Sequence, residues 1–306
     1  GNFPIGFKIW NTANHVTFKG TVSDVYDENG DYFTQKTFTA IEKKDFINKW
    51  VSKYKVESDF IGFLAGTNGN DFQQNGIVYI LNEKEQMANP RGIRISSKNL
   101  IQSSIYYAVR RTIKQTWLND RDQFLYPNDG WKKDRTFQND CLVFTLFHGQ
   151  NRISSKQGTN YWIPFTEQEV DAREKFESNF MTQFVKGKIK TDGSGIDLFS
   201  VVLEPKPEYR DRYVSKPALK FSKEASEVFD AGRSLWKYYH QQPNCNVNAS
   251  LYDIREHFQG RSDRGQMNSK SDDLTYVKLI TELRSKLKLL ADKITPKVYE
   301  YGFLKN

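Results

Sequence analysis

Apolar and polar residues alternate with a period of two along the first third of the chain, a pattern typical of strands that have one face in solvent. Two alternating segments lie on either side of Asn29-Gly30, and an Asn-Gly pair in this position favours a tight hairpin turn. The pattern predicts strands at residues 3–10, 21–26, 32–38, 60–64 and 77–81.

Helical spacing, in which apolar residues recur every three or four positions, occurs briefly at residues 46–54 and dominates after residue 96. The continuous apolar run at residues 141–147 is an exception and predicts a buried strand. Residues 186–217 are rich in Gly, Pro, Ser and charge, which indicates a linker or a long surface loop. Capping residues predict helix starts at Ser97 or Asn99, Thr166, Ser222, Asn248 and Ser271, and Pro296 is expected to end the last helix.

These elements predict an α+β fold, with a β-rich N-terminal part (hairpin and mixed sheet) followed by a predominantly helical C-terminal part. No internal repeat of about 20–50 residues is present, so a solenoid is not expected. Four regions are expected along the chain: an α/β region at 1–95, a basic helix–loop–strand region at 96–185, the loop or linker at 186–217, and a helical region at 218–306.

Composition narrows the class of protein. The chain has 306 residues, of which 38% are hydrophobic and 27% are charged. Because no run of about 18 apolar residues is present, we expect a soluble globular protein with no membrane partner. Cys141 and Cys245 are too few and too far apart for a disulfide framework or a cysteine-rich zinc site. A reducing compartment is expected, and the cytoplasm is the natural choice.

The net charge of +8 is concentrated in one tract, since residues 91–160 carry 12 basic and 5 acidic residues. Clustering of this kind is the expected electrostatic footprint of a surface that binds a polyanion such as nucleic acid. A solvated basic face without a partner would have the same composition, and this alternative stays open on charge alone.

Candidate DNA contacts follow from this tract. Its basic residues are expected to contact phosphates, Arg121 is expected to read a guanine edge, and two aromatic residues are expected to stack or wedge between bases. Trp117 lies on the apolar stripe of the predicted helix and is assigned to the core. The candidates are Tyr107, Arg110, Arg111, Lys114, Arg121, Trp131, Lys132, Lys133 and Arg135.

Motifs of several enzyme classes are absent. The four histidines lack the spacing of a zinc site, and neither a Walker A loop nor a G-x-S-x-G motif occurs. We predict no metal site and no catalytic residue. One alternative remains: Glu204-Pro205-Lys206 follows Asp192 and Asp197, and carboxylates beside a lysine bind Mg²⁺ in nucleases. Pro205 disfavours this Mg-dependent nuclease domain, because proline removes a ladder hydrogen bond from a strand.

A second alternative is a helical subunit-interaction module. Leu283, Leu287 and Leu290 are separated by four and then three residues. This spacing is typical of a coiled-coil seam, through which two chains could associate.

Five segments have a distinctive composition and order. They are FPIGFKIW at 3–10, WLNDRDQFLYP at 117–127, DCLVFTLFH at 140–148, NASLYDIR at 248–255 and PKVYEYGF at 296–303. Together they resemble the C-terminal half of large bacterial N6-adenine DNA methyltransferases of restriction–modification systems, including those fused to an endonuclease. The resemblance runs over most of the chain.

The resemblance implies that residues 1–95 are the end of the methyltransferase domain and that the remainder is a target-recognition region that grips double-stranded DNA. The family's catalytic half has a glycine-rich S-adenosylmethionine loop and an Asn-Pro-Pro-Tyr/Phe motif. Neither is present, since Asn89-Pro90 continues as Arg91-Gly92. The chain is therefore expected not to methylate alone, and S-adenosylmethionine is expected in the full-length enzyme or in a methyltransferase or restriction subunit.

Overall fold

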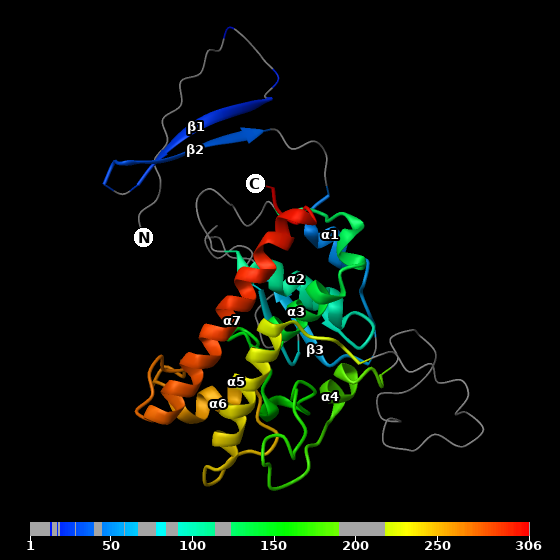
Figure 1. Cartoon of the computed structure of the whole chain (residues 1–306), viewed down its shortest axis with the longest axis vertical. Coiled ribbons are helices and arrows are strands. Elements are labelled where there is room, and N and C mark those ends of the chain that lie inside the picture. Colours follow the sequence, from blue (N-terminus) through cyan, green and yellow to red (C-terminus); the bar gives the residue numbers. More distant parts are fainter. Residues whose placement is uncertain are drawn as a thin grey trace, which may run out of the picture. The chain divides into compact units, whose positions relative to one another are not determined.

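The chain divides into two compact units, residues 1–44 and residues 45–306, and each is described by itself. The predicted boundaries at residues 95, 185 and 217 all fall inside the second unit. The computed structural model (Figure 1) describes residues 13, 17, 19–27, 29–39, 45–57, 59–66, 78–83, 91–113, 124–189 and 218–305.

The described part of the first unit is an antiparallel hairpin of β1 (Gly20–Tyr26) and β2 (Tyr32–Thr39). The Asp27 carboxylate accepts hydrogen bonds from the backbone N–H groups of Asn29 and Asp31, at 2.8 and 3.0 Å. These bonds hold the pKa of Asp27 below its usual value. Gly30 has a φ of +88°, a conformation that glycine adopts without steric cost. The hairpin predicted around Asn29-Gly30 is therefore confirmed.

The second unit contains a three-stranded antiparallel sheet in the order β4–β3–β5. The predicted strands at 60–64 and 77–81 are confirmed as β3 (Gly62–Gly66) and β4 (Val78–Leu81). The sequence pattern missed β5 (Arg91–Ile95), because Pro90 and Gly92 interrupt it. In the structure a Cβ at Gly92 would overlap the carbonyl oxygen of Leu64. Glycine therefore lets β5 lie close against β3.

Helices make up most of the second unit after residue 96, as the predicted α+β fold requires. Two helices begin at predicted capping residues: Asn99 is the N-cap of α2 and Ser222 is the N-cap of α5. The helices are α1 (Ile47–Ser52), α2 (Leu100–Thr112), α3 (Arg135–Phe147), α4 (Phe180–Val185), α5 (Lys223–His240), α6 (Leu251–Gln259) and α7 (Leu274–Glu300). Two short 3-10 helices join them at Asp129–Lys132 and Ser155–Gln157. No described helix is both long and apolar enough to cross a membrane.

Helix α7 organises the core of this unit. It packs along α5 and also contacts α3 and α2 (Figure 1). The predicted apolar stripe is confirmed, and all its members are buried: Tyr276, Ile280, Leu283, Leu287, Leu290 and Ile294. Leu283, Leu287 and Leu290 are thus used inside the unit, so the predicted seam for a second subunit is corrected to an internal one.

The predicted strand at residues 141–147 is wrong, because these residues form the second half of α3. Every residue from Phe137 to Phe147 is buried. A helix that is surrounded by protein on all sides loses the apolar–polar period that identifies helices in sequence. The continuous apolar run therefore has the same appearance as a buried strand.

Four predicted helix ends differ from the structure. The N-cap of α7 is Asp273 rather than Ser271. Thr166 and Glu169 form their reciprocal hydrogen bonds, at 2.8 and 3.4 Å, but only turns follow and α4 begins later. Ser250, rather than Asn248, is the N-cap of α6, with Asp253 completing a capping box. Pro296 lies inside α7, which continues to Glu300. The next stripe residue, Val298, is fully buried, so packing holds the helix past its proline.

Candidate functional site

Three of the nine predicted DNA contacts are buried. Tyr107 is 0% exposed, Arg110 is 5% exposed and Trp131 is 4% exposed. The Arg110 guanidinium lies over the rings of Tyr106 and Phe124, and Trp131 packs edge-to-face on Trp50. The prediction that these three side chains reach DNA is therefore corrected. It failed because the polar side of α2 is covered by other parts of the unit.

The remaining candidates are exposed at the surface, lie outside the described residues, or line a pocket. Lys132, Lys133 and Arg135 are exposed around the start of α3, where Lys132 pairs with Asp129 at 2.8 Å and Arg135 donates to Gln138 at 3.0 Å. Lys114 and Arg121 lie outside the described residues, as do residues 3–10, Trp117, Asp192, Asp197 and Glu204. Of the predicted set, Arg111 alone lines the pocket that follows, as far as the structure describes the chain.

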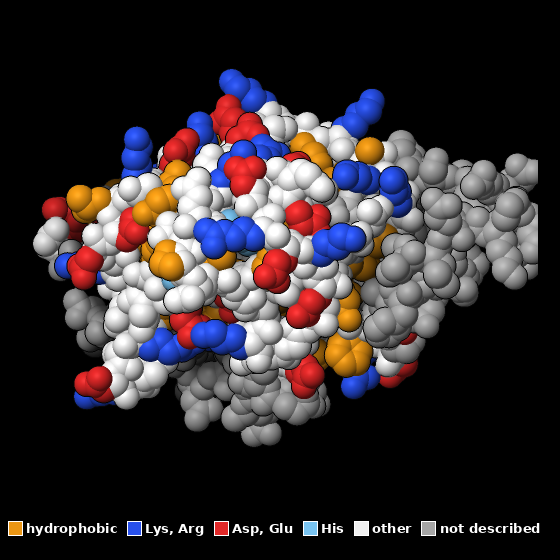
Figure 2. All heavy atoms as spheres, turned by 90° about the horizontal axis from the view of Figure 1, so that it is seen from below, with side chains coloured by type: hydrophobic (Ala, Val, Ile, Leu, Met, Phe, Trp, Pro, Cys, Tyr) orange, Lys and Arg blue, Asp and Glu red, His pale blue; other side chains and the backbone are white. Residues whose placement is uncertain are grey.

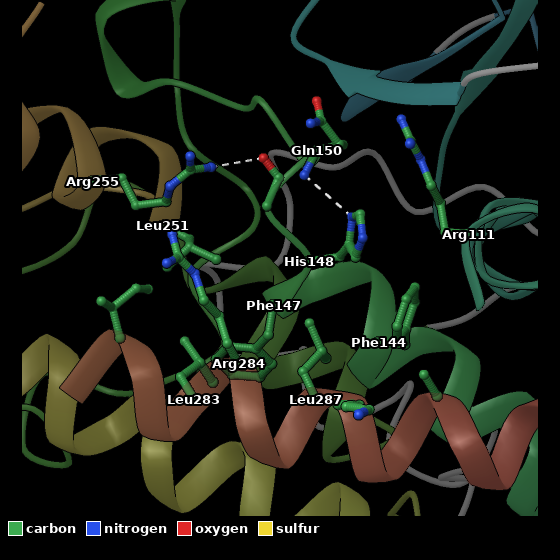
Figure 3. A pocket seen from close by; sticks show the side chains of 14 residues that line it. Arg111, Phe144, Phe147, His148, Gln150, Leu251, Arg255, Leu283, Arg284 and Leu287 are labelled. Atoms are coloured by element: carbon green, nitrogen blue, oxygen red, sulfur yellow. Dashed lines mark hydrogen bonds between the residues drawn. The ribbon is translucent and has the colours of Figure 1, made fainter. Parts of the chain in front are cut away.

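A cavity of about 380 Å³ lies where the end of α3 meets α6 and α7 (Figure 3). Four basic side chains line it: Arg111 from α2, Arg255 from α6, and Arg284 and Lys288 from α7. No Asp or Glu is among its described lining residues. We call this cavity the cationic pocket.

Two arginines of the cationic pocket are anchored by neutral oxygens. Arg111 donates through Nε and Nη2 to the carbonyl oxygen of Val78, and Arg255 donates to the carbonyl oxygen of Gly149 at 2.8 Å (Figure 3). Burial lowers the pKa of both guanidinium groups, but an arginine stays charged because its ordinary pKa is above about 12. Carbonyl anchoring orients each guanidinium without neutralising it.

Arg152 adds a fifth cation beside the cationic pocket. Its guanidinium lies 4.0 Å from the centre of the Tyr79 ring and donates to the Gln150 side chain at 2.9 Å. Arg111 lies over the same ring at 5.3 Å. Within the described part of the chain, no ion pair involves any of the five cations, Arg111, Arg152, Arg255, Arg284 and Lys288.

Some of the other basic residues of α7 form ion pairs. On α7, Lys286 pairs with Glu227 at 3.0 Å and Lys293 pairs with Glu224 at 2.9 Å. On the face seen in Figure 2, Lys and Arg side chains are mixed with Asp and Glu and form no single basic area. On α7, Arg284 and Lys288 of the cationic pocket therefore differ from Lys286 and Lys293, which have carboxylate partners.

His148 forms part of the wall between Arg111 and Arg255. Its Nδ1 accepts a hydrogen bond from the backbone N–H of Gln150 at 3.2 Å and lies 2.7 Å from the Tyr107 hydroxyl. Because a backbone N–H only donates, Nδ1 is the unprotonated nitrogen and Nε2 carries the hydrogen. Burial, together with Arg111 and Arg255, lowers the pKa of His148 to about 3. His148 is thus a neutral hydrogen-bond donor at neutral pH.

Residues 148–152 are joined to neighbouring elements by hydrogen bonds. The side-chain amide of Asn151 donates to the carbonyl oxygen of Thr145 at 3.1 Å. The backbone of Ile80 donates to Gln150 at 3.3 Å and accepts from Arg152 at 2.8 Å. These hydrogen bonds join the loop to the edge of β4.

Sequence reasoning missed most of this site. The basic tract at residues 91–160 ends about 95 residues before the first of three lining residues, Arg255, Arg284 and Lys288. The one available signal was the spacing of Arg284 and Lys288, four residues apart on the polar side of a predicted helix. That spacing is common on solvated helices, so it did not identify a site.

The described residues contain no group of three or more His, Cys, Asp or Glu side chains that could hold a metal ion. Comparison of the chain with models of protein families, with curated proteins and with solved structures finds no match. The chemistry of the cationic pocket and the sequence motifs are therefore what a functional proposal can rest on.

Proposed function

We propose that this chain is the DNA-binding, target-recognition portion of an N6-adenine DNA methyltransferase or restriction–modification enzyme, and that its cationic pocket contacts DNA phosphates. The observation that carries the proposal is the set of five cations around the cationic pocket, none with a carboxylate partner in the described residues. The resemblance of the five sequence segments supplies the enzyme family.

The physical reason is that a charge already paired with a carboxylate gains little from a phosphate. When a basic side chain neutralises a DNA phosphate, it displaces counterions that were condensed on the DNA. A basic side chain already paired with a carboxylate is not free to replace those counterions. Arginine suits this role because its planar guanidinium can donate two parallel hydrogen bonds to phosphate oxygens. Arg111 and Arg255 are already oriented by carbonyl oxygens, so little side-chain entropy remains to be lost on binding.

Catalysis is assigned elsewhere. The glycine-rich loop that holds S-adenosylmethionine in the family is absent from this sequence, so no residue here is assigned to that cofactor. The proposal includes a methyltransferase or restriction subunit, or another part of the same polypeptide, that supplies the reaction. Cys141 and Cys245 are free thiols, which supports a cytoplasmic location as part of the same proposal.

The test is salt-dependent binding of duplex DNA, measured by fluorescence anisotropy. Replacing both Arg284 and Lys288 by alanine should weaken binding and lower the slope of log K against log salt by about 2, roughly one unit for each lost phosphate contact. The matched control replaces Lys278 and Lys286, which lie on the same helix outside the lining of the cationic pocket. It removes the same charge and should leave the slope nearly unchanged.

Two results would contradict the proposal. One is the absence of measurable duplex binding even at low salt. The other is an equal loss in the two double variants, which would mean that net charge rather than the cationic pocket determines affinity.

A further inference from the structure

A short hairpin connects α6 to α7, and we call its residues 260–268 the α6–α7 hairpin. Arg261 and Met267 form an antiparallel bridge, and the backbone N–H of Ser262 donates to the carbonyl oxygen of Gln266 at 2.8 Å. In Figure 1 the hairpin is the orange loop between α6 and α7. Residues 261–266 are all exposed, so the end of the hairpin lies in solvent.

Side chains order the base of the α6–α7 hairpin. The Gln259 amide donates to the carbonyl oxygen of Asn268 at 2.6 Å, and the Asn268 amide donates to that of Gln259 at 3.0 Å. The Arg261 guanidinium donates to the Glu256 carboxylate at 3.0 Å and to the carbonyl oxygen of Gly265 at 2.7 Å. Because these bonds already order the hairpin, binding a partner through it costs little conformational entropy.

Three polar side chains near the end of the α6–α7 hairpin take no part in these bonds. Among the described residues, no side-chain hydrogen bond or ion pair involves Asp263, Arg264 or Gln266, and all three residues are exposed. In the major groove of DNA, arginine pairs with guanine, glutamine pairs with adenine, and aspartate accepts a hydrogen bond from cytosine. Because the Asp263 carboxylate repels phosphate, this end of the hairpin suits base edges better than the DNA backbone.

Hydrogen bonds join the α6–α7 hairpin to the cationic pocket. Nε of Arg255, which lines the cationic pocket, donates to the side-chain oxygen of Gln259 at 3.3 Å. The Tyr276 hydroxyl of α7 donates to the same oxygen at 3.1 Å. Arg255 and Arg264 are nine residues apart, so even an extended chain separates them by less than about 32 Å. One turn of duplex DNA is about 34 Å long, so a duplex held at Arg255 can present its groove to the hairpin.

We propose that the α6–α7 hairpin enters the major groove of bound DNA and that Arg264 and Gln266 distinguish base pairs there. The inference rests on the proposed function for the binding of DNA itself. Phosphate contacts position a duplex without distinguishing one sequence from another. A two-stranded ribbon fits the major groove, which is about 12 Å wide. Phosphate binding and sequence preference are thus assigned to different residues, the first to the cationic pocket and the second to the hairpin.

Selection from a library of DNA duplexes with a randomised central stretch tests the inference. The library is bound to the whole chain at one salt concentration and sequenced before and after selection. The unmodified chain should enrich a preferred sequence. Arg264→Ala should lose discrimination at one base pair and Gln266→Ala at another, each by about 5- to 150-fold, which is the range of one bidentate contact. Both positions are exposed, so folding is not at risk.

Arg173→Ala is the matched control. Arg173 is exposed in the turns before α4, outside the α6–α7 hairpin, and its replacement removes the same charge. This variant should keep the preferred sequence of the unmodified chain. The slope of log K against log salt, measured by anisotropy, should stay nearly unchanged in Arg264→Ala, because a contact to a base displaces no condensed counterions.

Each outcome decides the question. A preferred sequence that is unchanged in both Arg264→Ala and Gln266→Ala, or duplex binding with no preferred sequence at all, overturns the inference and leaves DNA binding by the cationic pocket standing. Equal weakening of all sequences by Arg264→Ala, with a slope lower by about 1, would make Arg264 a phosphate contact and also overturns it. Absence of duplex binding at low salt overturns the proposed function and the inference together.

Discussion

Tyr107 does not line the cationic pocket, but it contacts His148, which does. The Tyr107 hydroxyl lies 2.7 Å from Nδ1 of His148 and is fully buried. Together with the Gln150 N–H, it keeps Nδ1 unprotonated and turns Nε2–H away from that contact. Tyr107 was a candidate for stacking on DNA, and its position instead gives it a supporting role behind the wall of the cationic pocket.

The depressed histidine pKa values predict acid sensitivity of the fold. Burial lowers the pKa of His240 to about 4, and burial with two arginines lowers that of His148 to about 3. A histidine in the unfolded chain has a pKa of about 6.5, so below this pH the unfolded chain takes up protons that the folded chain does not. The free energy of unfolding therefore decreases as the pH is lowered. The limit is about 1.4 kcal/mol per pH unit for each histidine.

Urea denaturation between pH 7 and pH 5 measures this effect. His148→Gln should lower the pH dependence of the unfolding free energy, because one depressed group is removed. The second variant is His240→Gln, which should also lower the pH dependence of the unfolding free energy. His15 is not used, because it lies outside the described residues. A pH dependence identical to that of the unmodified chain in both variants would show that other groups cause it.

At the scale of helices and strands, α3, α5 and α7 form the core of the second unit. Ion pairs join them along one side: Lys293 of α7 reaches Asp140 of α3 at 3.3 Å and Glu224 of α5 at 2.9 Å. Burial raises the pKa of Asp140, and Ser222 and Lys293 oppose that effect. The close approach of α5 to α3 depends on Gly232, where a Cβ would overlap the ring of Phe147.

Gly232→Ala tests this approach. The added methyl group should force Phe147 or α5 to shift, which costs about 1–3 kcal/mol, and the better helix propensity of alanine returns up to about 1 kcal/mol. The midpoint of urea denaturation should therefore fall. Ser234→Ala, at an exposed position of the same helix, is the control and should change stability little. A Gly232→Ala protein as stable as the original would mean that the helices are not in close contact there.

At the scale of the whole molecule, the cationic pocket exists only because four segments meet. Arg111 comes from α2, His148 and Gln150 from the end of α3 and the loop after it, Arg255 from α6, and Arg284 with Lys288 from α7. All of them belong to the second unit, residues 45–306. The first unit contributes no described lining residue.

A chain of residues 45–306 should therefore fold cooperatively on its own, since a compact unit with its own core is independent of its neighbour. It should bind duplex DNA as tightly as the whole chain. Thermal denaturation followed by circular dichroism checks folding, and anisotropy checks binding. A folded fragment that has lost DNA binding would show that residues 1–44 carry the principal contacts.

The sequence by itself determined the local features: the Asn29-Gly30 hairpin, the start of α5 at Ser222, and the buried stripe of α7. These follow from turn geometry, capping and periodicity, which act within a few residues. Only the tertiary structure decided that residues 141–147 are helical, that Tyr107 and Arg110 are buried, and which basic residues stay unpaired. The physical reason is that burial on all sides, ion pairing and the shape of a pocket depend on neighbours distant in sequence, to which a local pattern does not respond.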